Sequence, residues 1–286
     1  MKVGVVFEGG GMRGVYTAGV IEAFLERDFM PDYVVGVSAG ASNGASYLSK
    51  QRGRALRCNI DYTDEPRYAS LKSWIKTGSY FGMDFLFGEI PQHYDPYDWD
   101  ACRANPCAFK IGTTDIETGL PHFFDKSDLD ERFTVIRASC SMPLFSRPIE
   151  WQGHIYLDGG VTRPIPFEEA LADGCDFLVV VLTQPRGYRK SPQKGLHIME
   201  QALGHYPALI EAMSLRHEVY NRELAELSAL EQAGKAFVLA PGEELKLDRM
   251  EKDGNRLKAA GRQGYLDGLD ALDTLRPLLA DRQWRL

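Results

Sequence analysis

Long hydrophobic runs, paired cysteines and an excess of basic charge are all missing from this sequence of 286 residues. No apolar run approaches the ~18–20 residues that a membrane-spanning helix needs. The apolar residues after Met1 end at Glu8, which is too soon for a secretory signal. The five cysteines are dispersed without a Cys-x-x-Cys pair, which argues against a disulfide scaffold and a zinc site. We therefore expect a cytoplasmic protein with no transmembrane segment, no bound metal and no cofactor.

The charge balance is acidic, with 40 acidic against 33 basic residues and a formal net charge of −7. A general attraction to nucleic acid is not expected from such a chain. Hydrophobic residues make up 44% and charged residues 26% of the sequence, which is typical of a folded protein with a sizeable core. The composition excludes disorder, collagen and coiled coil.

Buried strands and helices alternate in the first fifty residues. Residues 2–7 and 33–37 are short β-branched runs, and helical patterns follow them at residues 12–27 and from 39 through 48. The short connections favour parallel strands, and the order predicts a three-layer α/β/α fold with a mainly parallel central sheet. Further strands are predicted at 109–114, 120–124, 155–157, 177–182 and 235–239, and further helices at 129–138, 208–232 and, broken by glycines, 245–279.

The first of three glycine-rich loops is Glu8-Gly9-Gly10-Gly11-Met12-Arg13-Gly14, between a predicted strand and a predicted helix. Consecutive glycines let backbone N–H groups form an anion-binding nest for a phosphate or a developing oxyanion. Gly9, Gly11 and Gly14 also fit the dinucleotide fingerprint, but the acid that should hold a ribose after the second strand is missing. A nucleotide- or phosphate-binding protein stays open as an alternative.

The second loop, Gly36-Val37-Ser38-Ala39-Gly40, has the Gly-x-Ser-x-Gly pattern of a nucleophile elbow. The pattern is common by chance, and the competing interpretation is a plain turn with a serine helix cap. The strand predicted before it and the helix predicted after it favour the elbow.

The third loop, Asp158-Gly159-Gly160, follows a short predicted strand. Considered alone, Asp-Gly favours a tight hairpin turn; Asp158 gains importance because Ser38 needs a base. An α/β-hydrolase triad through Asp158 and His197 or His205 has the required chain order, but only one strand–helix unit precedes Ser38. The triad esterase therefore stays a second alternative.

Together, in this order and spacing, the three loops resemble the motifs of the patatin-like phospholipase family, lipid acyl hydrolases with a Ser-Asp dyad. The family's motifs are Asp-Gly-Gly-Gly-x-Arg-Gly, Gly-x-Ser-x-Gly and Asp-Gly-Gly or Asp-Gly-Ala. The resemblance covers residues 3–185 and includes Ala138-Ser139 with Pro143, similar to the family's Ala-Ser-x-x-x-Pro region. One departure is Glu8, where the family has aspartate.

The resemblance implies a serine hydrolase of lipid esters, of the phospholipase, lysophospholipase or lipid acyl hydrolase type. It implies Ser38 as nucleophile and Asp158 as base, with an oxyanion hole from the glycine loop (Gly9, Gly10, Gly11) and Ala39. Arg13 would anchor the loop or meet a substrate phosphate. The remaining motif positions are Glu8, Gly14, Gly36, Gly40, Gly159 and Gly160. The expected partner is a lipid ester, met either dispersed or at a membrane or micelle surface, so that a peripheral membrane location is compatible with the cytoplasmic one.

Two regions extend this prediction. Residues 74–99 contain eight aromatics: Trp74, Tyr80, Phe81, Phe85, Phe87, Tyr94, Tyr97 and Trp99. This segment is equally compatible with a lid or acyl-chain slot and with a satellite hydrophobic cluster.

We expect residues 1–185 to form the catalytic domain and residues 186–286 a mostly helical region that packs on the same sheet. A noncatalytic membrane-associated protein with a vestigial dyad is a further alternative, against which the intact Ser38 and Asp158 argue.

Overall fold

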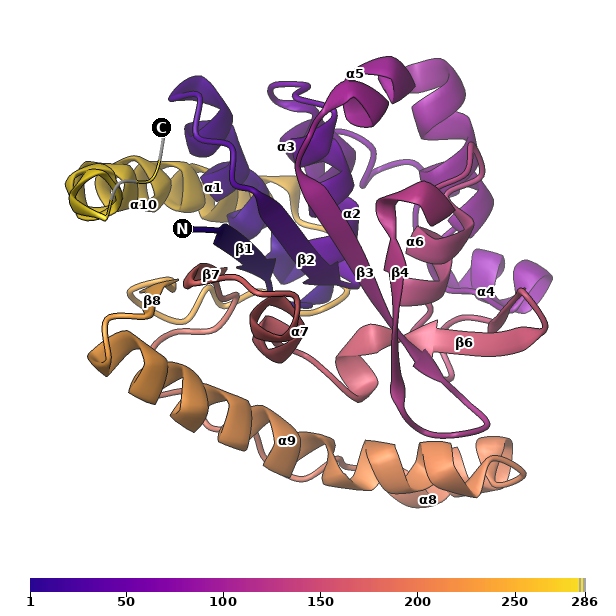
Figure 1. The fold of residues 1–286 in the computed structure, drawn as a ribbon. Coiled ribbons are helices and arrows are strands. Elements are labelled where there is room, and N and C mark those ends of the chain that lie inside the picture. Colours follow the sequence, from indigo (N-terminus) through magenta and orange to yellow (C-terminus); the bar gives the residue numbers. More distant parts are fainter. Residues whose placement is uncertain (283, 285–286) are drawn as a thin grey trace.

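An eight-stranded sheet forms the centre of the computed structural model, which describes residues 1–282 and 284 (Figure 1). The strand order is β5-β6-β3-β2-β1-β7-β8, with β4 paired to β3. The five central strands β3, β2, β1, β7 and β8 are parallel, whereas β4, β5 and β6 join by antiparallel pairing. The bounds are β1 Val3–Phe7, β2 Tyr33–Val37, β3 Ala108–Asp115, β4 Pro121–Asp125, β5 Ile149–Trp151, β6 His154–Asp158, β7 Phe177–Val181 and β8 Ala236–Leu239.

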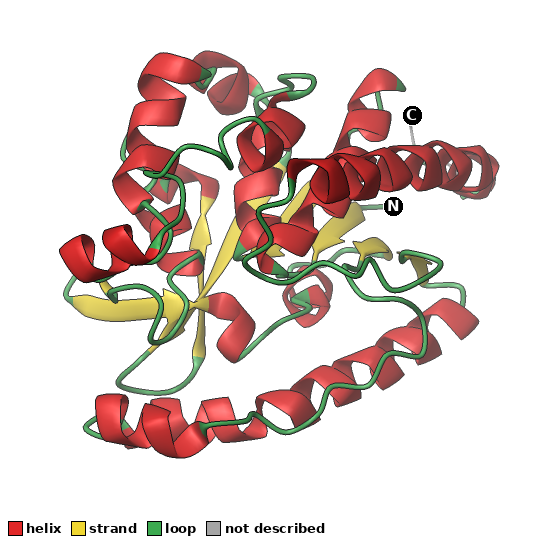
Figure 2. Cartoon of the chain, turned by 180° about the vertical axis from the view of Figure 1, so that it is seen from behind, coloured by secondary structure: helices red, strands yellow, loops and turns green. Residues whose placement is uncertain are grey.

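Helices cover both faces of the sheet, so the predicted three-layer α/β/α fold is confirmed (Figures 1 and 2). Helices α1, α2 and α10 pack on one face, and α7 and α9 pack on the other. The bounds are α1 Val15–Glu26, α2 Ala39–Leu48, α3 Arg54–Ile60, α4 Leu71–Thr77, α5 Trp99–Ala104, α6 Thr134–Ser139, α7 Phe167–Ala172, α8 Leu196–Leu203, α9 Pro207–Gln232 and α10 Gly254–Asp281, with a π-helix at Phe85–Tyr94 and 3₁₀ turns at Gly11–Gly14, Lys126–Asp128 and Gly159–Val161.

The strand sequences are continuous apolar runs because both of their faces are buried. In β1, Val5 and Phe7 belong to the core beneath α1 and α10, while Val6 belongs to the core beneath α7 and α9. In β7, Val179 and Val180 divide in the same way. This arrangement holds the carboxyl ends of β1 and β2, where the first two glycine loops begin, in a fixed position at one edge of the sheet.

Helix α10 is continuous, so the predicted interruption by glycines between residues 245 and 279 is wrong. The glycines instead lie where α10 crosses α1. A Cβ on Gly264 would come within 2.0 Å of the Tyr16 carbonyl oxygen, so only glycine permits this approach. Tyr16 also donates a hydrogen bond to Asp267 across the same contact, at 2.7 Å. The C-terminal helix is thereby fixed to the helix that follows the first glycine loop.

Three further expectations need correction. Helix α10 begins at Gly254 and not at 245, because the Asp253 side chain caps it and residues 241–253 are a loop. Helix α6 begins at Thr134 and not at 129, since Asp130 accepts hydrogen bonds from the Thr134 amide and hydroxyl. Strand β5 was not predicted; it pairs with β6 across a turn in which Gln152 and Gly153 have positive φ.

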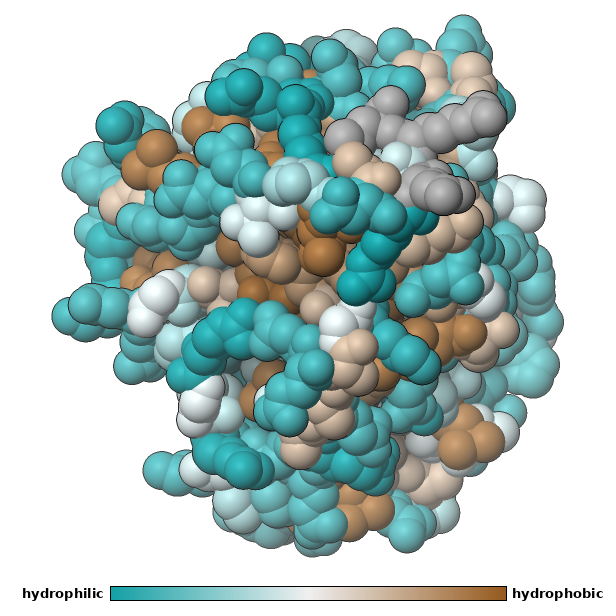
Figure 3. All heavy atoms as spheres, turned by 60° about the vertical axis from the view of Figure 1, so that its left-hand side comes forward, coloured by the Kyte–Doolittle hydropathy of each residue, from teal (hydrophilic) through white to brown (hydrophobic). Residues whose placement is uncertain are grey.

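The surface shown in Figure 3 is mostly hydrophilic, and hydrophobic residues are visible in smaller areas between the hydrophilic ones. Among the described residues, no helix combines the length and the apolar character needed to cross a bilayer.

Candidate active site

Ser38 occupies a sharp turn between β2 and α2. Its φ of 54° and ψ of −126° are unusual for a residue with a side chain, and strain of this kind persists where the surroundings enforce it. The flanking glycines allow the turn: a Cβ on Gly40 would lie 2.4 Å from the Phe7 carbonyl oxygen, and one on Gly36 would lie 2.6 Å from the Gly40 backbone. The local geometry is that of a nucleophile elbow, which projects the serine hydroxyl from the sheet.

Asp158 lies directly opposite Ser38, although 120 residues separate them in the chain. The Ser38 Oγ donates to Asp158 Oδ2 at 2.7 Å, and the Gly160 amide donates to Oδ1 at 2.7 Å. The Thr114 hydroxyl donates to the Asp158 carbonyl oxygen at 2.9 Å. Both side chains of the pair are buried. The chain continues from Asp158 into a 3₁₀ turn, so the interpretation of Asp158-Gly159 as a hairpin turn is wrong.

Burial raises the pKa of Asp158 above the ordinary aspartate range. The hydrogen bonds from Ser38 and Gly160 and the positive charges of Arg216 and Arg249 act in the opposite direction, but burial outweighs them. A carboxylate with a raised pKa accepts a proton more readily than one in water. The environment thus makes Asp158 a stronger base than its residue type suggests.

Ser139 connects the elbow to the sheet. Its hydroxyl accepts a hydrogen bond from the Ser38 amide at 2.8 Å and donates one to the Gly112 carbonyl oxygen at 2.6 Å. Ser139 is fully buried at the end of α6. The serine of the Ala138-Ser139 segment therefore holds the backbone of Ser38 in its strained conformation.

The glycine loop presents two backbone amides beside Ser38. The amides of Gly10 and Gly11 donate in none of the hydrogen bonds recorded among the described residues, nor does that of Ala39 at the start of α2. The Gly9 amide, in contrast, donates to the Pro164 carbonyl oxygen at 3.2 Å. Gly9 consequently supports the loop, and the candidate oxyanion donors are reduced to three.

Glu8 joins the glycine loop to the C-terminal region. Its buried carboxylate accepts hydrogen bonds from the Thr183 amide at 2.5 Å and the Thr183 hydroxyl at 3.1 Å, and from the Tyr220 hydroxyl on α9 at 2.9 Å. Both carboxylate oxygens accept hydrogen bonds, so glutamate, which is longer than the family's aspartate, is accommodated at this position.

Two pockets meet at Ser38. The first, the apolar pocket, is open to solvent and has Ser38 in its lining. Its walls are mainly hydrophobic side chains: Met12, Ala45, Tyr68, Phe81, Met83, Leu86, Phe87, Pro91, Phe133, Ile136 and Met142. Four of these come from residues 81–87, so the aromatic segment supplies a wall of the pocket. Tyr80 and Phe85 pack in the hydrophobic cluster that also contains Met12 and Tyr68 of this wall.

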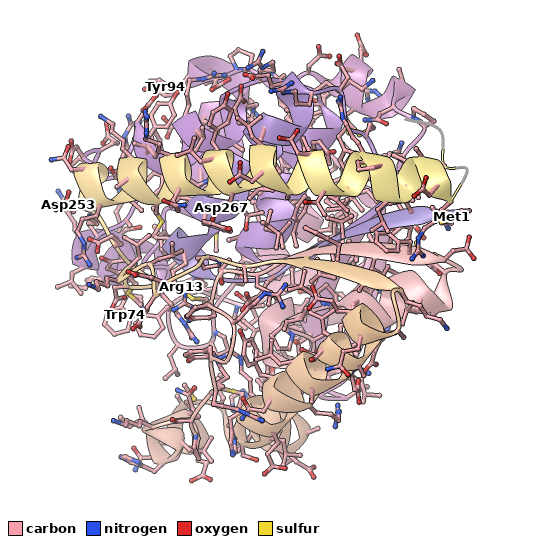
Figure 4. The ribbon with its side chains drawn as sticks, turned by 90° about the vertical axis from the view of Figure 1, so that its left-hand side faces the viewer. Met1, Arg13, Trp74, Tyr94, Asp253 and Asp267 are labelled. Carbon is pink, nitrogen blue, oxygen red and sulfur yellow. The ribbon has the colours of Figure 1, made fainter. Side chains whose placement is uncertain are left out.

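The second pocket, the cationic pocket, lies on the other side of the dyad. Four basic residues line it: Arg13, Lys190, Arg216 and Arg249. Figure 4 labels Arg13 between the layer of α10 and that of α9. Burial and the neighbouring Arg249 lower the pKa of Arg13. The buried Nε of Arg13 has no hydrogen-bond partner in the described part of the chain.

Among the described residues, no histidine lines either pocket. Nδ1 of His154 lies 3.1 Å from Asp115, and Nδ1 of His217 contacts the Ser214 carbonyl oxygen. His197 and His205, the two residues considered for a triad, form no recorded side-chain hydrogen bond within residues 1–282 and 284. The triad interpretation therefore gains no support from the geometry.

A family model of patatin-like phospholipases matches residues 5–171, more than half of the chain. The chain belongs to the patatin-like phospholipase family. A second model, described as a domain of unknown function, matches residues 206–280. The Escherichia coli protein YjjU is 31% identical over 197 residues, covering 67% of this chain and 55% of YjjU. Lysophospholipase NTE1 of Meyerozyma guilliermondii is 28% identical, covering 63% of this chain and 12% of NTE1.

The solved structure of VipD from Legionella pneumophila is similar in fold, with a TM-score of 0.52 and 14% identity. The match covers 96% of this chain and 67% of VipD. At that identity the likeness concerns the fold alone.

Sequence reasoning missed the part of the site that lies outside the three loops. Lys190, Arg216 and Arg249 lie in a loop, a helix and another loop, and no spacing relates them. Ser139 was noticed only as part of a family-like segment. Of these four residues, only Ser139 lies in a segment that resembles a family motif.

Proposed function

We propose that this protein hydrolyses carboxylic esters of lipids, with Ser38 as nucleophile and Asp158 as general base. The observation that carries the proposal is the buried 2.7 Å hydrogen bond from Oγ of Ser38, which lines the apolar pocket, to Asp158 Oδ2. A serine hydroxyl is a weak nucleophile that needs an adjacent base, and the pair supplies one without a histidine. Family membership supports the same chemistry.

The reaction begins when Ser38 Oγ attacks the ester carbonyl carbon and its proton passes to Asp158 Oδ2. The negative charge that develops on the carbonyl oxygen is stabilised by the amides of Gly10, Gly11 and Ala39, which have no protein acceptor among the described residues. Collapse of this intermediate breaks the bond to the alcohol, which takes the proton from Asp158. The fatty acyl group stays attached to Ser38.

A water molecule completes the cycle. Asp158 removes one of its protons as the water oxygen attacks the acyl carbon, the same three amides stabilise the second oxyanion, and Ser38 recovers its proton as the fatty acid leaves. We place the acyl chain in the apolar pocket, whose walls suit a hydrocarbon chain. Residues 1–185 would contain the reacting groups, and residues 186–286 would complete the site by packing on the same sheet.

Arg13 is proposed to face the substrate and not to anchor the glycine loop. An anchoring arginine donates hydrogen bonds to its surroundings, whereas Arg13 donates none that is recorded in the described part of the chain and its Nε lacks a partner. Its place in the wall of the cationic pocket is compatible with a substrate phosphate or carboxylate.

The protein is proposed to meet its substrate at a lipid surface, at the periphery of a cytoplasmic membrane or on a micelle. Helix α4 exposes Leu71, Trp74 and Ile75, with 67%, 43% and 84% of their surface accessible. Lys72 and Lys76 lie on the same short helix and are exposed. Exposed apolar residues combined with basic ones are typical of surfaces that insert into an anionic lipid interface.

The decisive experiment is covalent labelling with a fluorophosphonate followed by mass spectrometry. We expect one adduct, on Ser38, and loss of both labelling and ester hydrolysis in Ser38→Ala. Ser42, which also lines the apolar pocket, serves as the matched control: Ser42→Ala should keep the label and lose no more than a few-fold in kcat. An adduct on another serine, or full activity in Ser38→Ala, would end the assignment.

A further inference from the structure

The cationic pocket differs in charge from the protein that contains it. The whole chain carries a formal net charge of −7, yet the pocket gathers Arg13, Lys190, Arg216 and Arg249. The two carboxylates that line it accept hydrogen bonds from other groups: Glu8 from Thr183 and Tyr220, and Asp158 from Ser38 and Gly160. None of the four basic residues forms an ion pair within 4.0 Å in the described residues.

Burial and mutual repulsion make these charges costly. The pKa of Lys190 is lowered to about 7, first by burial and then by the charges of Arg216 and Arg249. The pKa of Arg216 is lowered to about 10, again by burial and by Arg249. Positive groups that repel one another in a partly buried cavity lower the stability of the empty protein, and a bound anion would relieve that repulsion.

Three of the four cations come from the C-terminal part of the chain, beyond the residues that match the patatin-like model. Lys190 lies in the loop after β7, Arg216 on α9 and Arg249 in the loop before α10. Two contacts bring these segments to the dyad: Arg216 Nε donates to the Gly160 carbonyl oxygen, and the Arg249 carbonyl oxygen accepts from the Met12 amide at 3.1 Å. The pocket is therefore a joint product of both parts of the chain.

Ser38 stands at the boundary between the apolar and the cationic pocket, because it lines both. The cationic pocket also has apolar lining residues, among them Phe145, Met199 and Met213. Because a hydrocarbon chain avoids charged groups, we place the acyl chain of a lipid ester in the apolar pocket, with the carbonyl carbon of the ester at Ser38. The alcohol part of the ester then extends into the cationic pocket, among the four basic groups.

We propose that Lys190, Arg216 and Arg249 form a head-group subsite that binds the anionic phosphate of an acylated glycerol and so selects anionic over uncharged lipid esters. This inference rests on the proposed function and adds the substrate class. The C-terminal region thereby has a specificity role at the dyad. Arginine and lysine are the usual partners of phosphate, and several together tolerate a phosphomonoester better than a head group carrying its own positive charge.

The test compares two esters with the same short acyl chain, 1-octanoylglycerol 3-phosphate and 1-octanoylglycerol, each below its aggregation concentration. We expect the native protein to hydrolyse the phosphate ester with at least tenfold higher kcat/KM. Lys190→Gln and Arg249→Gln should each lower kcat/KM for the phosphate ester about tenfold, as expected for one charged hydrogen bond. The preference, measured as the ratio of kcat/KM for the phosphate ester to that for the uncharged ester, should therefore fall in both variants.

Matched controls separate the pocket from general electrostatics. Arg189→Gln removes the same charge from the exposed neighbour of Lys190, and Arg222→Gln does so on the outer face of α9. Neither residue lines the pocket, so both variants should keep the preference. The backbone of Lys190 is held by two hydrogen bonds with the Asn221 side chain, so Lys190→Gln should fold. An unchanged preference in Lys190→Gln and Arg249→Gln, or an equal loss in the controls, overturns the subsite.

A binding measurement keeps the proposal separate from the activity. Calorimetric titration of the Ser38→Ala protein with glycerol 3-phosphate should give binding that Lys190→Gln weakens about tenfold and Arg189→Gln does not. If no ester is hydrolysed, the proposed function fails while this titration still decides the subsite. If inorganic phosphate binds but the phosphate ester is not preferred in hydrolysis, the pocket serves a free anion and the head-group proposal is wrong.

Discussion

Replacing Asp158 by asparagine should abolish turnover and at the same time stabilise the fold. Asparagine has the shape of aspartate, its Oδ1 can accept from the Gly160 amide, and its Nδ2 can donate to Ser38 Oγ, so both hydrogen bonds of the native side chain have a replacement. What is lost is the negative charge and the ability to take a proton. The substitution therefore separates the cost of the buried charge from the geometry of the site.

The direction of the stability change follows from the raised pKa of Asp158. A carboxyl group whose pKa is higher in the folded than in the unfolded protein stabilises the fold below its unfolded pKa, and this contribution is lost as the pH rises through the folded pKa. At neutral pH the ionised Asp158 thus lowers the free energy of unfolding. Asparagine is neutral at every pH and removes this cost, but it also gives up the attraction of Arg216 and Arg249.

We expect a net gain of about 1 kcal/mol in the free energy of unfolding at pH 7–8, which is within the usual range for a stabilising substitution. For a chain of this size that gain raises Tm by about 2–4 °C. The gain should shrink as the pH falls toward the ordinary aspartate range, because the native carboxyl group then becomes neutral too. Turnover should fall by about 10³-fold or more, since the nucleophile has lost its base.

The assay is a pair of thermal unfolding curves, native and Asp158→Asn, recorded at several pH values between 5 and 8.5, together with kcat on an octanoyl ester. The native kcat/KM should decline on the acid side at a higher pH than an ordinary aspartate would give, because Asp158 must be ionised to act as base. A variant that is less stable than the native protein at pH 8, with circular dichroism showing an intact fold, would refute the reasoning about the buried charge. A variant with substantial activity would refute the role of Asp158 as base.

Two further predictions concern the support of the nucleophile and the lipid surface. Ser139→Ala removes the acceptor of the Ser38 amide and the donor to the Gly112 carbonyl oxygen. We expect the free energy of unfolding to fall by about 1–3 kcal/mol and fluorophosphonate to label Ser38 more slowly. Labelling at the native rate would show that Ser139 does not hold the elbow. Leu71→Ser combined with Ile75→Ser should lower cosedimentation with phosphatidylglycerol vesicles about tenfold without changing kcat/KM on a dispersed ester. Vesicle binding at the native level would show that α4 does not contact the lipid surface.

The sequence predicted the sheet from local signals, whereas the Ser38–Asp158 pair was predicted from the resemblance of three loops to a known family. Strands buried on both faces are continuous apolar runs, so β1, β2 and β7 were found within one residue of their ends. Ser38 and Asp158 each stand at the end of a strand, and the pairing of neighbouring strands brings such ends together. Strand β5 escaped prediction because its three residues, Ile-Glu-Trp, are too few to show alternation.

The C-terminal part could not be predicted in the same way, because its features depend on partners distant in the chain. Glycines in α10 weaken a helix when considered locally, but Gly264 is required by the backbone of Tyr16, about 250 residues earlier. The cationic pocket is a stronger case, since its basic residues belong to separate segments and become neighbours only when the chain is folded. Neither periodicity nor motif spacing contains that information.

Glu8 was visible as a motif position in the sequence, but its contacts are visible only in the folded chain. As a departure from the family's aspartate it was visible in the sequence, but its meaning depends on Tyr220 of α9, 212 residues away. The carboxylate reaches Thr183 after β7 with one oxygen and Tyr220 with the other, and a side chain shorter by one methylene would not span both at the same backbone position. Tyr220 lies one helical turn from Arg216 and beneath the ammonium group of Lys190, which is 4.7 Å from its ring centre. The same hydrogen bond therefore fixes the glycine loop to the helix that carries the head-group subsite, so the longer acid aligns the proposed oxyanion donors with the residues proposed to choose the substrate.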